Sequence, residues 1–110
     1  MKLPHGEKAF IDLVKLRDYS LSASHAEGKH KARVFAASLG LRRNDAEWLR
    51  DQLLSAVLNH ECQLGPKTGF GQRYVLDFPV RFLSREARIR SAWIIRTHED
   101  FPRLTTCYVL

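Results

Sequence analysis

The spacing of the apolar residues changes once along this chain, and the change divides it into two halves. Before residue 65, apolar side chains recur every three or four residues, as they do on one face of a helix. After residue 71 they recur every second residue, which is typical of a strand with one buried face. Gly65, Pro66, Gly69 and Gly71 interrupt both patterns. The sequence therefore predicts an α+β fold, with helices first and an antiparallel sheet second.

An amphipathic helix is predicted to begin at Lys29. Apolar side chains recur on one of its faces from Ala32 to Leu39. Gly40 follows directly, and glycine is the residue that most readily takes the left-handed conformation at a helix end. We therefore expect this helix to stop at Gly40.

A second, longer helix is predicted to run to about Leu58. Asn44 and Glu47 have the spacing of a capping box, in which a polar cap is followed three residues later by a carboxylate. Nearer the N-terminus, Asp12 has the character of a cap for a short helix that ends near Tyr19.

Three strands are predicted over residues 72–82, 88–97 and 104–110, and residues 8–11 suit a short fourth strand at an edge. Short connections between consecutive strands indicate an antiparallel β-meander of three or four strands. Pro79 has no backbone N–H, so it is expected at a sheet edge or a bulge. The N-terminal helices should pack on one face of this sheet.

A single domain is expected over residues 1–110. A chain of 110 residues with 45% hydrophobic content is large enough for one modest core. The apolar faces of the helices and the sheet should meet in that core. The residues expected there are Phe35, Leu39, Leu49, Leu53, Phe78 and Ile94.

The charge of the chain bears on its partners. It has 18 Lys and Arg against 12 Asp and Glu, a formal net charge of +6. A basic surface attracts nucleic acid, anionic membranes or acidic proteins. A solvated basic surface without a specific partner is the alternative.

The two cysteines, Cys62 and Cys107, are too few for a disulfide scaffold, and no further ligands accompany Cys62 and His60 to form a zinc site. We expect no metal and no cofactor. No apolar signal core follows the N-terminus, and no segment is long and apolar enough to span a bilayer. The cytoplasm is the expected location.

The first candidate site is the basic cluster around Gly28, Lys29, His30, Lys31 and Arg33. Cations in the first turns of a helix oppose its dipole, so this cluster does not stabilise the helix that carries it. A histidine can transfer protons near neutral pH, and Lys and Arg can bind a phosphate. A solvated basic face is the commoner explanation for such a run of charges.

A second candidate segment contains Gly69, Gly71, Gln72, Arg73 and Tyr74. Glycines before a strand allow a ligand to approach the backbone, and an arginine can bind its phosphate. The segment lacks the Lys and Ser/Thr of a P-loop, which argues against nucleotide binding. Glycines that serve only the turn are the alternative.

The third candidate is on the last two strands, with Trp93, Thr105, Thr106 and Tyr108. Strand alternation puts Thr106 and Tyr108 on one face and Thr105 on the other. Hydroxyls on a sheet face can position a phosphate or a ribose. The strand preference of Thr, Tyr and Trp is the competing explanation.

Five segments together resemble a family of small bacterial domains of unassigned function. They are KLRDYSL at 15–21, GKHKARVFAASLGL at 28–41, GQRYVLDFP at 71–79, SAWIIR at 91–96 and DFPRLTTCYVL at 100–110. Members of that family occur alone beside small antitoxin-like partners, and as C-terminal domains of polymorphic toxins. The GKHKARVF motif carries most of the resemblance.

The resemblance implies an architecture similar to the RelE, barnase and EndoU ribonucleases. Such enzymes cleave RNA without a metal: a base takes the ribose 2′-OH proton, and cationic groups stabilise the phosphorane. The first hypothesis is therefore a metal-independent ribonuclease toxin, with RNA as substrate and a small acidic antitoxin or immunity protein as partner. The second is a non-catalytic module that binds nucleic acid or an acidic protein.

The ribonuclease hypothesis assigns roles to nine residues. The expected catalytic residues are His30, Lys31, Arg73, Thr106 and Tyr108. The expected substrate-binding residues are Lys29, Arg33, Tyr74 and Trp93.

Overall fold

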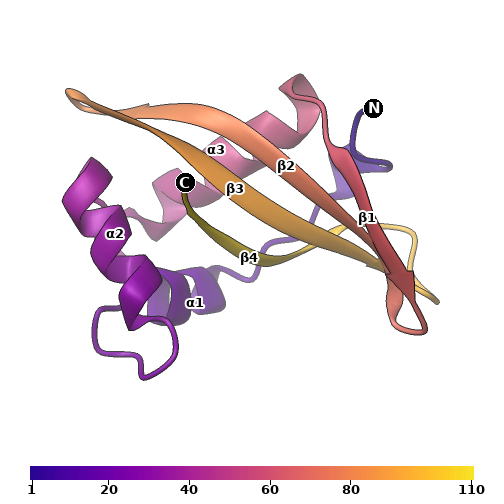
Figure 1. Cartoon of the computed structure of the whole chain (residues 1–110), viewed down its shortest axis with the longest axis horizontal. Coiled ribbons are helices and arrows are strands. Elements are labelled where there is room, and N and C mark those ends of the chain that lie inside the picture. Colours follow the sequence, from indigo (N-terminus) through magenta and orange to yellow (C-terminus); the bar gives the residue numbers. More distant parts are fainter.

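An antiparallel sheet and a layer of helices on one of its faces make up the molecule (Figure 1). The structure, a computed structural model, describes residues 1–110. The helices are α1 (Leu13–Lys15), α2 (Lys29–Leu39) and α3 (Ala46–Asn59). The strands are β1 (Gln63–Thr68), β2 (Gly71–Phe82), β3 (Arg85–Arg96) and β4 (Arg103–Val109). The α+β class is confirmed, with the helices first.

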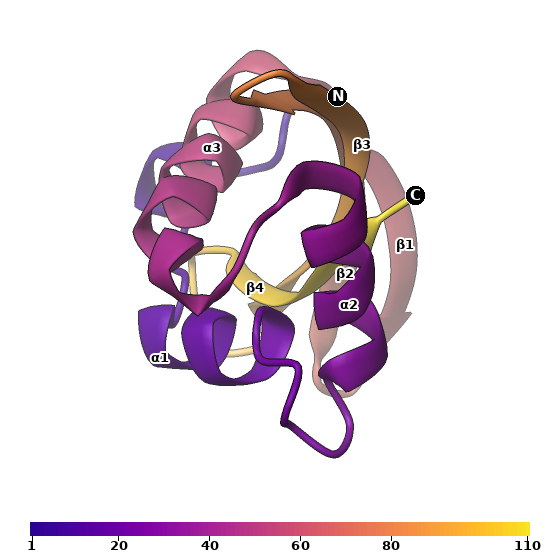
Figure 2. The ribbon, with the colours of Figure 1, turned by 90° about the vertical axis from the view of Figure 1, so that its left-hand side faces the viewer.

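The sheet has four strands in the order β1-β2-β3-β4, and all neighbours are antiparallel. Sheet order therefore follows chain order, as the short connections predicted. In Figure 1, α3 lies behind the sheet and α2 lies beside one end of it. Figure 2 shows the same arrangement from that end, with α2 in front and α3 and α1 away from β1.

Strand β2 pairs with β3 along its whole length, and this pairing fixes the two faces of the sheet. Tyr74 lies opposite Trp93, and Phe78 lies opposite Ile89. These residues are buried against the helices, and Trp93 and Ile89 are fully enclosed. The other face carries no helix, and we call it the open face.

The core joins this buried face to the apolar faces of α2 and α3. Phe35, Leu39, Leu49, Leu53 and Phe78 are all buried in one cluster, as predicted.

The predicted core needs a correction at Ile94, which lies outside the main cluster. It is also buried, but it pairs with Arg73 and Arg103 on the open face and does not belong to the main cluster.

Strand β1 was not predicted, because Gly65 and Pro66 interrupt its pattern. The register shifts between Leu64 and Lys67, so a bulge accommodates these two residues while pairing with β2 continues on both sides. Pairing with β1 ends at Val75 of β2. Strand β2 is therefore an edge beyond that point, which is why Pro79 is tolerated there.

The start of α3 differs from the predicted capping box at Asn44 and Glu47. Residues 43–45 form a 3₁₀ turn instead, and Asp45 Oδ2 accepts a 2.9 Å hydrogen bond from the backbone N–H of Arg42. The box therefore lies two residues earlier than predicted, and α3 begins at Ala46.

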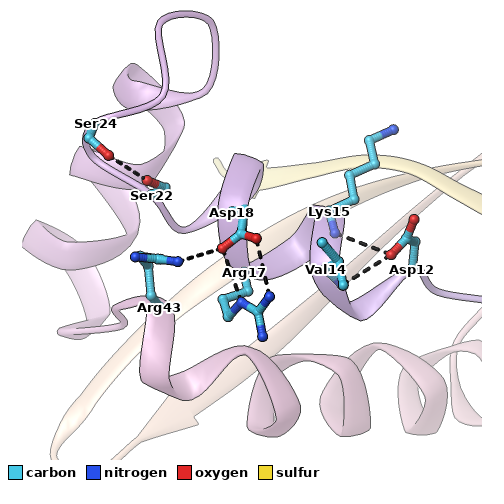
Figure 3. A network of polar contacts seen from close by, with 8 residues as sticks. All are labelled: Asp12, Val14, Lys15, Arg17, Asp18, Ser22, Ser24 and Arg43. Atoms are coloured by element: carbon cyan, nitrogen blue, oxygen red, sulfur yellow. Dashed lines mark hydrogen bonds and ion pairs between the residues drawn. The ribbon is translucent and has the colours of Figure 1, made fainter.

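The predicted strand at residues 8–11 is reduced to a single parallel bridge between Phe10 and Arg103. Asp12 caps α1 as predicted, because its Oδ1 accepts hydrogen bonds from the N–H groups of Val14 at 3.0 Å and Lys15 at 3.2 Å (Figure 3). A π-helical turn continues α1 to Ser20.

Asp18, in that turn, ties the N-terminal helices to the start of α3. It accepts hydrogen bonds from Arg17 and from Arg43, which follows α2 (Figure 3). Arg17 and then Arg43 lower the pKa of Asp18 to about 2. Asp18 thus links the π-helical turn to the 3₁₀ turn before α3 at the exposed edge of the helical layer.

No helix of the structure has both the length and the apolar character that crossing a membrane requires.

We predict that Leu53→Ala lowers the free energy of unfolding by about 2–5 kcal/mol, because it leaves a cavity in a fully buried part of the core. Leu58→Ala is the matched control on the same helix, since Leu58 is 57% exposed. It should cost less than about 0.5 kcal/mol. Denaturant unfolding of both variants measures the difference, and equal losses would contradict the packing described.

Candidate functional site

Helix α2 places a lysine over the edge of the sheet. Ala32, Phe35 and Leu39 hold the helix against the core. Lys31, on the flank beside this buried face, donates a 3.0 Å hydrogen bond from Nζ to Oγ1 of Thr106. The same Nζ lies 5.4 Å from the centre of the Tyr108 ring, within the range of a cation–π interaction. Residues 31, 106 and 108 therefore form one cluster.

The register of β4 brings Thr106 and Tyr108 onto the open face. Thr106 lies opposite Ala92, and Tyr108 lies opposite Arg90. The two residues share a face of the sheet, as strand alternation predicted. A bulge sets Thr105 apart from this pattern, and its hydroxyl donates a 3.0 Å hydrogen bond to the carbonyl of Ala92.

An open hollow lies between α2 and the end of β4. Its lining consists of His30, Lys31 and Val34 from the helix and Tyr108 and Val109 from the strand. The side chain of His30 is exposed, and no side-chain hydrogen bond fixes its ring. The hollow thus combines a group that can transfer a proton, a cation and a phenol in one place.

The open face next to this hollow carries a charged pair that sequence analysis missed. Arg90 donates from Nε and Nη2 to the two carboxylate oxygens of Asp77, both at 2.9 Å. This bond keeps the pKa of Asp77 below its usual value. Asp77, and after it the neighbouring hydroxyl of Tyr108, raise the pKa of Arg90. Asp77, Arg90 and Tyr108 are in register across three strands.

More arginines lie on this face. On β2 and β3, each position that faces this side of the sheet and is neither apolar nor acidic holds an arginine. Alternation alone indicates them once the register is known. They are Arg73 and Arg81 on β2, and Arg88, Arg90 and Arg96 on β3.

Arg73 lies on the same face as Thr106, but on β2, which is two strands away. Val75 is the residue of β2 level with Thr106, and Arg73 lies two residues further along that strand. No hydrogen bond or ion pair joins its side chain to the cluster around Lys31. Lys29 and Arg33 each lie two positions from Lys31 on α2, so helix geometry places them on the opposite flank. The structure thus brings together His30, Lys31, Thr106 and Tyr108 from the predicted set.

The predicted substrate-binding set needs a correction at Tyr74 and Trp93. Both side chains are buried in the core, on the face of the sheet that packs against the helices. The indole N–H of Trp93 donates a 2.9 Å hydrogen bond to Oγ of Ser91, which donates in turn to the carbonyl of Leu76. A side chain that is fully enclosed cannot stack on a substrate. Both aromatic residues serve the core.

No group of three or more His, Cys, Asp or Glu side chains is arranged to hold a metal ion. Cys62 and Cys107 are both buried and unpaired. Burial raises the pKa of the Cys107 thiol to about 12, so this thiol stays protonated and behaves as an apolar side chain.

The comparisons with known proteins identify the family. The model of a family described as "Domain of unknown function (DUF6883)" matches residues 2–110. The chain belongs to this family. The predicted resemblance to a family of unassigned function is confirmed to that extent. Among curated proteins, none matches the chain.

This chain can also be compared with solved structures by fold. One similar chain comes from a structure described as a contact-dependent growth inhibition toxin – immunity protein complex from Klebsiella pneumoniae 342. The TM-score is 0.70 at 13% sequence identity, and the match covers 91% of this chain and 98% of the other. The two chains share a fold.

The position of α2, and with it Lys31, depends on a close approach at Gly28. A Cβ atom at residue 28 would lie 2.1 Å from the carbonyl oxygen of Tyr19. We predict that Gly28→Ala forces the backbone apart and lowers the free energy of unfolding by about 1–3 kcal/mol. Gly69→Ala is the control, since nothing lies within 4 Å of a Cβ at residue 69. Denaturant unfolding compares them, and a Gly28→Ala protein as stable as wild type would contradict the prediction.

Proposed function

We propose that this protein is a metal-independent ribonuclease that acts as a toxin, with its active site in the hollow between α2 and β4. The observation that carries the proposal is the contact of Lys31 with Thr106 and Tyr108, beside a hollow that His30 also lines. RNA cleavage needs a proton carrier and a cation at one phosphate, and this hollow supplies both.

The reaction follows from these residue types. His30 removes the proton from a ribose 2′-OH, and the oxygen attacks the adjacent phosphate. The 5′-oxygen of the next nucleotide leaves and takes up the proton that His30 now carries, which restores the neutral imidazole, and a 2′,3′-cyclic phosphate remains. Lys31 stabilises the negative charge that develops on the phosphate oxygens, while Thr106 and Tyr108 orient the group through their hydroxyls.

The arginines of the open face extend the site. Arg73 lies on β2, two strands away from Thr106 and two residues along from the position level with it, so it would bind a phosphate further along the RNA strand and not the reacting one. The net charge of +6 supports attraction of a polyanion to this surface.

The toxin setting rests on two further observations. The similar fold belongs to a structure whose description names a toxin and an immunity protein. The basic charge of this chain suits a small acidic antitoxin or immunity protein that blocks the open face.

One observation favours a non-catalytic alternative. No carboxylate or carbonyl forms a hydrogen bond with the ring of His30, although catalytic histidines are commonly oriented by such a group. A module that binds nucleic acid or an acidic protein needs the charges of this face but not an oriented histidine. Loss of His30 separates the two functions, since a binding module tolerates it.

The first test is activity of the intact protein. We expect the purified protein to cleave single-stranded RNA in the presence of a chelator, and its expression without a partner to arrest growth. Gel analysis of the RNA and viable counts measure the two outcomes. Binding of RNA without cleavage or growth arrest would favour the non-catalytic module. Failure to bind RNA at physiological salt would refute both nucleic-acid functions.

The second test concerns His30. We predict that His30→Ala lowers the cleavage rate by a factor of about 10² to 10⁴, which is the usual contribution of a general acid or base. RNA affinity should stay near that of the wild type, because Lys31 and the arginines remain. His98→Ala is the matched control, since His98 is an exposed histidine in the loop before β4. Equal rates for the two variants would remove His30 from the mechanism.

Lys31→Ala is expected to weaken RNA binding and cleavage together, since the proposed mechanism gives Lys31 the substrate phosphate to bind and the lysine also contacts the Thr106 hydroxyl.

A further inference from the structure

Arg90 is held in one orientation by the sheet itself. Its guanidinium forms a two-pronged bond with Asp77 on the neighbouring strand, both distances being 2.9 Å. An arginine in such a pair has lost most of its side-chain freedom before any ligand arrives.

The pair with Asp77 leaves part of the Arg90 guanidinium available. A guanidinium has five N–H donors, and the bond to Asp77 uses two of them. The Tyr108 hydroxyl lies beside the remaining donors, but no hydrogen bond of normal length and angle joins them to it or to any other group. The Arg90 side chain is 39% exposed, so these donors reach solvent on the open face.

The position of Arg90 connects it to the hollow. Arg90 and Tyr108 are opposite each other on β3 and β4, and Lys31 lies over the ring of that same tyrosine. Two cations from different elements therefore flank one phenol. Arg73, by contrast, lies further along the sheet and contacts neither Tyr108 nor Lys31.

The other strongly bonded arginine of the sheet shows what a purely structural role looks like. Arg103 forms a two-pronged bond with Glu99 at 2.8 and 2.7 Å. Its guanidinium also lies 5.1 Å from the ring centre of Phe10 and 4.9 Å from that of Phe101. Aromatic rings cover Arg103, whereas none covers Arg90.

We propose that Arg90, oriented by Asp77, is a phosphate-binding residue that holds the RNA strand one phosphate away from the group at Lys31. Asp77 is a positioning residue and does not touch the substrate. This inference rests on the proposed function, since it assigns the second phosphate contact of the same substrate. The proposal predicts that loss of the negative charge at Asp77 weakens the binding of a polyanion. Net charge alone would predict the opposite, which is tighter binding.

The test measures affinity without cleavage. His30→Ala protein serves as the background, in the presence of a chelator, and fluorescence anisotropy of a short labelled single-stranded RNA gives the dissociation constant. Arg90→Gln should weaken binding about tenfold or more, the usual loss for a hydrogen bond to a charged group. Asp77→Asn should weaken it about two- to tenfold, because binding must then order the arginine.

Glu86→Gln provides the matched control. Glu86 also pairs across β2 and β3 on the open face, with Arg81, but at 3.5 Å and with both side chains largely exposed. This variant gains the same net charge as Asp77→Asn and should bind RNA as tightly as its parent or more tightly. Arg90→Lys keeps the charge and loses the two-pronged bond, so it should fall between Arg90→Gln and the parent. Thermal unfolding checks each variant, and if Asp77→Asn does not fold, Arg90→Lys decides.

Three outcomes would overturn the proposal. If Asp77→Asn binds RNA as tightly as Glu86→Gln, Asp77 does not position Arg90. If Arg90→Gln binds like its parent while the wild type still cleaves RNA, the Arg90 contact is refuted and the proposed function stands. If the His30→Ala parent does not bind RNA, both fail. Cleavage is scored separately with His30 intact, so binding without cleavage refutes only the ribonuclease.

Discussion

The antiparallel pairing of β2 with β3 is the constraint on which the rest of this structure depends. Because side chains alternate between faces, one register decides at once that Phe78 and Trp93 enter the core and that Asp77 meets Arg90 outside it. A slip by a single residue would exchange the two faces. It would bury a row of arginines under the helices and expose the largest aromatic residue of the core.

The buried face tolerates polar groups only where they are paired. The indole of Trp93 and the hydroxyl of Ser91 form a chain of hydrogen bonds that ends on a backbone carbonyl of β2, and no buried side-chain polar atom lacks a partner. The open face follows a different rule, because water solvates it. It can keep Arg90 partly unsatisfied, and such donors are what an anionic ligand needs.

Sequence patterns predicted the elements better than the site. The helix from Lys29 to Leu39 and its glycine end were correct, because the apolar period and the cap act within a few residues. The error at Asn44 arose because another carboxylate, Asp45, had an equally suitable backbone N–H two residues before that cap. The role assigned to Trp93 failed because residue type does not reveal which face of a strand is covered.

What the sequence by itself determined is the local periodicity of the main elements, which is where α2, α3 and strands β2 to β4 form and which of their residues share a face, together with a net charge that suits a polyanion. What only the tertiary structure decided is which of these faces meet. The contact of Lys31 with Thr106 joins residues 75 positions apart, and that of Arg90 with Asp77 joins two strands. Neither contact leaves a mark on the spacing of neighbouring residues, because chain folding sets the distance between them and local propensity does not.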